Sequence, residues 1–218
     1  GIVDFFTSRK IKIFGPDQFA AQLEGSKSFM KDLCNEHSIP TAQYEKFQNS
    51  DDAIKYLETQ SYPIVIKADG LAAGKGVTIA EDFKTASIAV QDIFNAKFGE
   101  NMDVVIEEFM NGEEASYFIC SDGKNFISLI SAQDHKRIGE NDTGPNTGGM
   151  GAYSPAPVFT ENVKKQVDTE IIKPTLKAML DKGHPFKGIL YAGLMIENER
   201  AKLVEYNIRF GDPECQVL

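Results

Sequence analysis

Near the end of the chain, residues 202–210 alternate between polar and apolar side chains. Successive side chains of a β-strand point to opposite faces, so Glu205, Asn207 and Arg209 share one face. The other face carries apolar residues, which we expect to be packed: Val204, Tyr206, Ile208 and Phe210. Oxygen donors two residues apart suit a hard cation such as Mg²⁺, whose other ligands are water and substrate phosphates. An ordinary solvent-exposed strand face has the same composition, so the pattern alone leaves both interpretations open.

A glycine-rich loop, Gly70–Gly76, is a candidate phosphate-binding loop. It resembles a Walker A loop but fails the pattern, because three residues rather than four separate Gly70 from Gly74, and Gly76 replaces the Ser or Thr. The segments on either side are strand-like, and the loop is therefore expected to join two antiparallel strands. Its backbone N–H groups and Lys75 would close over phosphates. A plain flexible hairpin tip also contains such residues.

Neighbouring segments would complete a nucleotide site. Lys67 ends an apolar strand and would place its compact charge on a phosphate, although a solvated edge lysine is the alternative. A second strand leaves the core and would present its backbone to an adenine edge through Glu107, Glu108, Phe109 and Met110. Glu113 or Glu114 would accept hydrogen bonds from ribose hydroxyls. The alternative for this segment is a strand end with two solvated carboxylates.

The three histidines of the chain show no metal-ligand spacing. His135 lies within Asp134-His135-Lys136-Arg137, directly before a glycine-rich stretch. We expect residues 133–154 to form one long loop without secondary structure, and such loops are usually functional or disordered. His135 is therefore a candidate substrate contact, and a structural role is equally compatible with its position.

The overall composition limits the class of protein. Of 218 residues, 42% are hydrophobic and 25% are charged, which excludes a disordered or fibrous chain. The net charge of −9 argues against nucleic acid or an anionic membrane as a partner. The longest purely apolar stretch, Gly188–Ile196, is far shorter than the ~20 residues of a membrane span. Three widely spaced cysteines indicate neither a disulfide framework nor a zinc site, so we predict a cytoplasmic location.

The periodicity predicts an α+β fold with largely antiparallel strands, in which residues 45–109 form a small lobe inside a larger one. Residues 188–197 and 202–210 are expected to pair as a hairpin. Asn111-Gly112 is typical of a hairpin turn, so the strand before it is expected to pair with 115–120. Further expected elements are a strand at 12–14, a helix at 51–60 capped by Ser50, a helix capped by Asp82, and a helix at 161–180.

The order of these pieces resembles the glycinamide ribonucleotide synthetases, also called phosphoribosylamine–glycine ligases, a family of ATP-grasp enzymes of purine synthesis. The most specific stretch is Arg209–Gln216, Arg-Phe-Gly-Asp-Pro-Glu-Cys-Gln, followed by Thr143–Tyr153. The resemblance covers nearly the whole chain through four further stretches, 23–27, 67–77, 107–116 and 134–137. The glycine loop alone would indicate only an ATP-grasp enzyme.

The resemblance implies an ATP-grasp fold, in which two antiparallel-sheet lobes clasp the nucleotide. The residues implied in ATP binding are Lys27, Lys67, Gly70, Gly74, Lys75, Gly76, Glu107, Glu108, Phe109, Met110 and Glu114. Glu205 and Asn207 would bind Mg²⁺ or Mn²⁺. Many ATP-grasp enzymes carry another metal-binding carboxylate on the preceding strand, where this chain has Tyr-Ala-Gly at 191–193. We therefore expect phosphate and water to supply more of the metal's ligands.

The implied reaction joins glycine to 5-phosphoribosylamine through glycyl phosphate and yields glycinamide ribonucleotide, ADP and phosphate. Arg209 and Asp212 would be catalytic, and Cys215 would be dispensable. The residues implied in substrate binding are Asp134, His135, Thr147, Gly148, Gly149 and Met150. The partners would be these small molecules, with neither nucleic acid nor membrane, and we expect a monomer or a weak dimer.

The resemblance also implies a division of the chain into parts of a longer protein. Residues 1–22 would be the tail of an N-terminal substrate-binding domain, and 23–218 the ATP-grasp region with 45–109 as its lid lobe, without the C-terminal domain. One alternative is another ATP-grasp enzyme, such as a purine-pathway carboxylase or formate-dependent transformylase, which the stretch Arg209–Gln216 disfavours. A non-catalytic nucleotide-binding module is disfavoured by the complete set of phosphate, metal and acyl-site residues.

Overall fold

The computed structural model describes residues 1–218 apart from 72–75, 100–101, 141–142 and 148, and it divides into two compact units. The large unit comprises Gly1–Glu24, Asp32–Thr41 and Asn111–Leu218. The small unit comprises Gly25–Lys31 and Ala42–Met110. Each unit contains its own four-stranded sheet.

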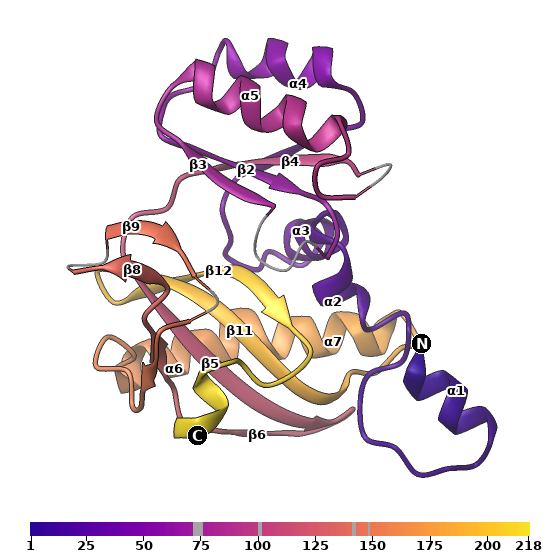
Figure 1. Ribbon diagram of the computed structural model, residues 1–218. Coiled ribbons are helices and arrows are strands. Elements are labelled where there is room, and N and C mark those ends of the chain that lie inside the picture. Colours follow the sequence, from indigo (N-terminus) through magenta and orange to yellow (C-terminus); the bar gives the residue numbers. More distant parts are fainter. Residues whose placement is uncertain (72–75, 100–101, 141–142, 148) are drawn as a thin grey trace. The chain divides into compact units, whose positions relative to one another are not determined.

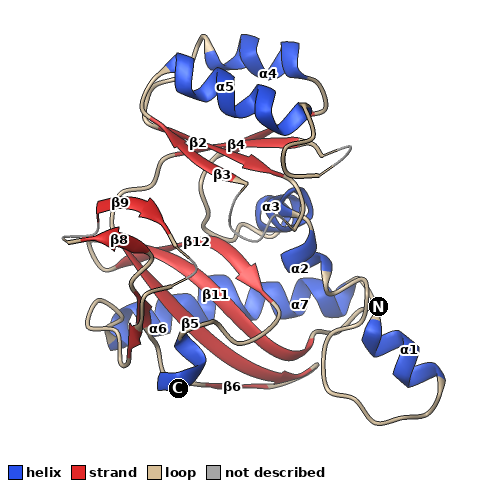
Figure 2. Ribbon diagram, viewed as in Figure 1, coloured by secondary structure: helices blue, strands red, loops and turns tan. Residues whose placement is uncertain are grey.

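The small unit is built on an antiparallel sheet with the strand order β1-β4-β2-β3 (Figure 1). The strands are β1 (Tyr44–Phe47), β2 (Ile64–Ala68), β3 (Val77–Ala80) and β4 (Val104–Glu108). Helices α4 (Ser50–Leu57) and α5 (Phe83–Phe94) cover one face of this sheet (Figure 2). The pairing of β2 with β3 confirms the hairpin expected around the glycine loop.

Side-chain caps fix where the two helices of the small unit begin. The Asp82 carboxylate accepts a hydrogen bond from the Thr85 N–H, which confirms the predicted cap of α5. Helix α4 is capped by Asn49, whose side chain accepts from the Asp52 N–H, and not by Ser50 as the sequence suggested. Asn and Ser are both good caps, and here the extended backbone of Asn49 places its amide oxygen over the first turn.

The large unit contains a second antiparallel sheet with the order β12-β11-β5-β6. Its strands are β5 (Glu113–Asp122), β6 (Phe126–Ser128), β11 (Lys187–Glu197) and β12 (Arg200–Asn207). The pairing of β11 with β12 confirms the hairpin expected at the end of the chain. Two small ladders complete the strands: β7 (Gln133–Asp134) with β10 (Ala152–Tyr153), and β8 (Arg137–Gly139) with β9 (Thr143–Asn146).

One face of the large sheet is covered by helical residues 161–181, namely α6 (Glu161–Val167), a π-helical turn (Asp168–Ile172) and α7 (Lys173–Asp181) (Figure 2). The Gln166 side chain, buried in α6, bonds both the N–H and the C=O of Ala201 in β12. The Thr175 hydroxyl in α7 lies 2.5 Å from the Tyr206 hydroxyl. These contacts leave the opposite face of the sheet for the candidate site described below.

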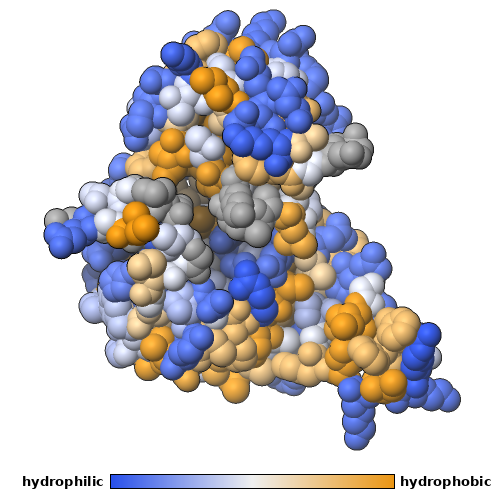
Figure 3. Space-filling view, in the orientation of Figure 1, coloured by the Kyte–Doolittle hydropathy of each residue, from blue (hydrophilic) through white to orange (hydrophobic). Residues whose placement is uncertain are grey.

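The remaining helices are α1 (Ile2–Ser8), α2 (Gln22–Gly25), α3 (Lys27–Glu36) and a 3₁₀ turn (Glu214–Val217). Figure 3 shows apolar surface over α1, where Ile2 and Phe5 are exposed, as is Phe14 beyond the helix. None of the helices in the described part of the chain has the length and apolar character that a bilayer crossing needs.

Three expected elements differ in the structure. Asn111-Gly112 does not close a hairpin, because β4 pairs in the small sheet and β5 in the large one. Residues 12–14 form no strand. Residues 133–154 are not a plain loop, since they carry the two small ladders β7-β10 and β8-β9. Local turn chemistry suggested the hairpin, but long-range strand pairing decides which sheet each strand joins.

Candidate functional site

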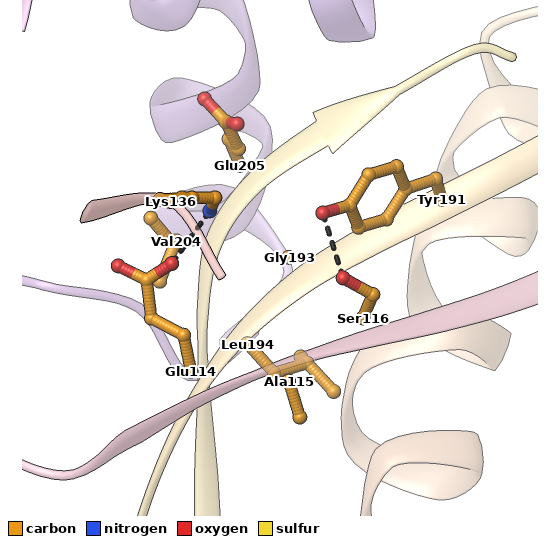
Figure 4. Close-up of a pocket in the computed structure, with 9 residues that line it drawn as sticks. All are labelled: Glu114, Ala115, Ser116, Lys136, Tyr191, Gly193, Leu194, Val204 and Glu205. Carbon is orange, nitrogen blue, oxygen red and sulfur yellow. Dashed lines mark hydrogen bonds and ion pairs between the residues drawn. The ribbon is translucent and has the colours of Figure 1, made fainter. Parts of the chain in front are cut away.

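The face of the large sheet opposite helices α6 and α7 carries a pocket lined by residues of β5, β11 and β12 and by Lys136, which follows β7 (Figure 4). Its polar lining residues are Glu114, Ser116, Lys136, Tyr191 and Glu205. All of them belong to the large unit. The sequence predicted Glu114 and Glu205 as site residues, but it did not single out Ser116, Lys136 or Tyr191.

A buried hydrogen-bonded trio forms one side of this site. The Tyr191 hydroxyl donates to Glu214 Oε1 at 2.9 Å, and Ser116 Oγ lies 2.8 Å from that hydroxyl and 3.0 Å from the same carboxylate oxygen. All three side chains are buried. Burial raises the pKa of Tyr191 far above its usual range, and Lys136 opposes this shift only in part. Tyr191 is therefore a neutral hydrogen-bond donor.

Glu214 is the buried acid that sequence reasoning missed. It stands within the distinctive stretch Arg209–Gln216, next to the exposed Cys215. A Cβ on Gly211 would lie 2.2 Å from Glu214 Oε2, so this glycine is required for the carboxylate to fold back against the backbone. An acidic residue in a short surface turn is usually solvated, and nothing in the sequence indicates that this one is buried.

Lys136 forms ion pairs with two acids, of which Figure 4 shows Glu114. Its ammonium lies 2.5 Å from Glu114 Oε2 and 3.9 Å from Asp134 Oδ1. Burial is the largest single influence and lowers the pKa of Lys136, but Glu114, Tyr191 and Asp134 together outweigh it, and the pKa of Lys136 is raised. Burial raises the pKa of Asp134, which Lys136 lowers in part. Lys136 is thus paired with both Glu114, which the sequence predicts to bind ribose, and Asp134, which it predicts to bind substrate.

A β-bulge decides how β12 presents Glu205. Gly193 pairs with Glu205 and the next residue, Leu194, pairs with Leu203, so Val204 has no partner of its own. Val204 consequently lines the pocket beside Glu205. The prediction that it shares the packed face with Tyr206 is wrong, because the bulge breaks strict alternation. Glu205 remains on the pocket face, as the pattern predicted.

Glu205 and Asn207 together fit the requirements of a small divalent cation. The Glu205 carboxylate is half-buried and forms no hydrogen bond or ion pair with the residues that the structure describes (Figure 4). Asn207 is buried, and its Oδ1 accepts a 3.0 Å hydrogen bond from Arg209. In the described residues, no three His, Cys, Asp or Glu side chains gather to hold a metal. Two protein oxygens plus phosphate and water are a donor set that Mg²⁺ or Mn²⁺ accepts.

The two residues expected to be catalytic, Arg209 and Asp212, follow the end of β12. Arg209 is more than half exposed, and its Nε lies 3.2 Å from Glu24 Oε1. The other Glu24 oxygen accepts from the Ile208 N–H at 2.9 Å. Glu24 therefore fixes both the backbone and the guanidinium at this point. Asp212 is exposed.

The segment expected to orient the substrates is held by its own backbone. The N–H groups of Thr147 and Met150 donate to the carbonyls of Lys136 and His135 at 2.7 and 2.8 Å. The Gly149 N–H donates to Thr147 Oγ1, and a Cβ on Gly149 would lie 2.5 Å from Pro213 Cδ. Only glycine fits this close approach. The substrate-binding role of Asp134, His135, Thr147, Gly149 and Met150 remains a prediction, and Gly148 lies outside the described residues.

In the small unit, Lys67 lies within a buried charged cluster. Its ammonium bonds Glu107 Oε2 at 2.9 Å, and the Lys31 ammonium lies 3.0 Å from the same oxygen. The sequence identified Lys67 and Glu107 but not Lys31. In the sequence Lys31 lies among other polar residues of a helix, where a lysine is normally exposed, and so nothing there indicates that it is buried.

The start of the glycine loop is anchored to α3. Lys27 Nζ donates to the carbonyls of Ala68 and Gly70 at 2.8 Å each. The Ser26 hydroxyl caps the helix by accepting from the Phe29 N–H at 3.1 Å, and the Asp69 carboxylate accepts from the Ser28 N–H at 3.2 Å. At the other end of the loop, the Gly76 carbonyl accepts from the Ala68 N–H. Gly74 and Lys75 lie outside the described residues.

The segment expected to meet adenine follows the end of β4. The Glu108 N–H donates to the Gln43 carbonyl at 3.0 Å, and Glu108 Oε1 accepts from the Gln43 N–H at 3.2 Å. The Glu107 side chain points into the buried cluster rather than to solvent. Phe109 and Met110 are half-buried beyond the strand. Adenine binding by this backbone remains a prediction.

The arrangement of strands in the two units is typical of one class of protein. Two units with four-stranded antiparallel sheets, one of them carrying a glycine-loop hairpin and a buried lysine, are the architecture of an ATP-grasp protein. The family model "Phosphoribosylglycinamide synthetase, ATP-grasp (A) domain" matches residues 25–215. The chain belongs to this family, and its ATP-grasp fold was predicted correctly from the sequence.

Similar proteins support this placement. The chain is 55% identical over its whole length to phosphoribosylamine–glycine ligase of Agrobacterium fabrum, of which it covers 52%. It is 54% identical to the chloroplastic phosphoribosylamine–glycine ligase of Arabidopsis thaliana, of which it covers 42%. The crystal structure of phosphoribosylamine–glycine ligase from Thermotoga maritima superimposes with a TM-score of 0.89 at 36% identity, covering 98% of this chain and 55% of that one. The chain thus spans about half the length of the relatives that it matches.

Proposed function

We propose that this chain is the ATP-grasp region of an enzyme that ligates glycine to 5-phosphoribosylamine, with ATP as the energy source. The observation that carries the proposal is the 55% identity to a phosphoribosylamine–glycine ligase across the entire chain. The structure adds a pocket whose side chains have the charges that such a reaction needs. The partners are small molecules.

Each unit contributes a distinct kind of group. In the small unit, the Lys67 ammonium would contact phosphate, and the backbone of residues 107–110 would take adenine. In the large unit, Glu114 would bind ribose. Glu205 and Asn207 would hold Mg²⁺ or Mn²⁺, which when bound neutralises phosphate charge. Arg209 and Asp212 would act on the reacting groups.

The proposed chemistry has two steps. An oxygen of the glycine carboxylate attacks the γ-phosphorus of ATP, the bond from that phosphorus to the β–γ bridging oxygen breaks, and ADP leaves. The amine of 5-phosphoribosylamine then attacks the carbonyl of glycyl phosphate, loses a proton, and phosphate leaves with the glycine oxygen. Phosphoryl transfer needs mainly positioning and charge stabilisation from the protein. The Arg209 guanidinium would stabilise the charge on the transferring group.

An isotope experiment on the full-length enzyme tests this route. Glycine labelled with ¹⁸O in its carboxylate is converted in the presence of ATP, Mg²⁺ and 5-phosphoribosylamine, and the inorganic phosphate is analysed by mass spectrometry. The acyl-phosphate route transfers one labelled oxygen to phosphate in each turnover. Product formation without label in phosphate would exclude the intermediate. Failure of glycine to stimulate ADP release at all would exclude the ligase function itself.

A further inference from the structure

A buried cluster of the small unit brings two lysines onto one glutamate. Lys31, Lys67 and Glu107 have exposed fractions of 0%, 5% and 2%. They come from three elements, α3, β2 and β4. The nucleotide roles proposed above involve Lys67 and leave the other cation, Lys31, unexplained.

Both ammonium groups meet the same carboxylate oxygen. Glu107 Oε2 lies 3.0 Å from Lys31 Nζ and 2.9 Å from Lys67 Nζ. Glu107 Oε1 is buried and has no hydrogen-bond partner among the described residues. Lys31 is held further by the Ala42 carbonyl at 3.3 Å, and its ammonium lies 5.7 Å from the centre of the Tyr44 ring. Lys31 is therefore held in a fixed position next to the Glu107 carboxylate.

The charges of this cluster decide what Lys67 offers to a ligand. A pair of Lys67 and Glu107 alone would carry no net charge, and the carboxylate would cancel much of the attraction between Lys67 and an anion. With Lys31 on the same carboxylate, the three side chains together carry one net positive charge. Solvent screens buried charges only weakly, so this excess acts on groups bound at Lys67.

We propose that Lys31 is a positioning and charge-balancing residue of the phosphate site. It neutralises Glu107 and thereby leaves the charge of Lys67 available to a nucleoside triphosphate. This inference rests on the proposed phosphate contact of Lys67. It assigns to Lys31 an effect on nucleotide affinity although Lys31 does not touch the nucleotide.

A purely structural role for Lys31 predicts a different result. Buried ion pairs often contribute little net stability, but removing one partner leaves a buried charge and destabilises the protein. In that case Lys31 variants would lose stability and would bind phosphate as before once folded. The two roles are separated by restoring the net charge without restoring Lys31.

The experiment measures the affinity of the full-length protein for the β,γ-imido analogue of ATP and for adenosine by titration calorimetry. Lys31→Met removes the cation and keeps an apolar chain of similar length. We expect it to weaken binding of the analogue about tenfold or more, as expected from losing one charged interaction, and to leave adenosine unchanged. The double variant Lys31→Met/Glu107→Gln regains one net positive charge, and we expect it to recover most of the lost affinity. Equal affinity of Lys31→Met and the parent protein, or a double variant no tighter than the single one, would overturn the proposal.

Two controls keep the outcome clear. Lys55→Met removes an exposed lysine from α4 of the same unit, and it should bind both ligands as the parent protein does. If Lys31→Met does not fold, a second pair of variants tests the same loss of one positive charge. Glu107→Gln keeps both lysines and the double variant keeps only Lys67, so the double variant should bind the analogue more weakly than Glu107→Gln. If the parent protein binds no nucleotide, the proposed function fails, whereas normal parent binding with insensitive variants refutes only the role of Lys31.

Discussion

The charged clusters described in the two units have opposite net charge. In the small unit, two lysines converge on a single oxygen of Glu107. In the large unit, acids prevail around Lys136, with Glu114 and Asp134 beside it, and Glu205 lines the same pocket. A cationic cluster suits phosphate, whereas an acidic one suits a metal ion or an ammonium group. The chain's net charge of −9 conceals this division, because it averages over both units.

The two units also differ in the groups that contact their buried carboxylates, Glu107 and Glu214. Glu107 is neutralised by ion pairs alone and keeps one oxygen without a partner in the described structure. Glu214 is held by the neutral hydroxyls of Ser116 and Tyr191. Neutral donors leave the negative charge of a carboxylate in place, whereas ammonium groups cancel it. The large unit therefore preserves acidity at its site, and the small unit preserves positive charge.

The largest effect should come from removing acidity at the pocket. Glu205→Gln keeps the volume of the side chain and removes its charge, so the fold should be retained. We expect activity to fall roughly a hundredfold at limiting Mg²⁺, because metal-ion charge stabilisation is worth several kcal/mol. Steady-state kinetics across a Mg²⁺ titration measure this effect. Glu197→Gln, at an exposed position in β11, is the matched control and should behave as the parent enzyme. Near-normal activity and an unchanged Mg²⁺ requirement in Glu205→Gln would refute the metal assignment.

A smaller effect is expected from the neutral donors. Tyr191→Phe removes the hydroxyl that donates to Glu214 at 2.9 Å and leaves a buried carboxylate with one donor fewer. The free energy of unfolding should fall by about 1–3 kcal/mol, the cost of depriving a buried charged group of a hydrogen bond. Urea denaturation measures this change. Tyr153→Phe, which removes the hydrogen bond of a more exposed hydroxyl to Gln133, should cost within about 0.5 kcal/mol. Equal stability of the two variants would show that the buried trio does not hold Glu214.

The smallest effect is expected at Cys215, the neighbour of Glu214 in sequence. Its side chain is exposed, whereas Glu214 is buried within the trio. The proposed reaction needs no thiol nucleophile, so Cys215→Ala should leave kcat and KM unchanged. Loss of activity in this variant, measured under the same conditions as the parent enzyme, would reopen covalent catalysis.

Some residues of the candidate site could be proposed from the sequence, because polar side chains stand out in a strand that is otherwise apolar or strictly alternating. Glu205 was placed on the pocket face by alternation alone, and Lys67 was singled out at the end of an apolar strand. Ser116, Tyr191 and Glu214 could not be found this way. Ser and Tyr are ordinary residues of a half-buried strand, and the burial of Glu214 depends on Gly211 and on two strands far away in the chain.

By itself the sequence determined the α+β class, the hairpins around the glycine loop and at the end of the chain, and the family, because these depend on local periodicity and contiguous motifs. Only the tertiary structure decided that Asn111-Gly112 joins two different sheets, that a bulge turns Val204 toward the pocket, and that Lys31 is buried against Glu107. Each of these outcomes depends on pairing between segments distant in sequence. Such pairing is selected by burial and strand register over the whole unit, and no local propensity encodes it.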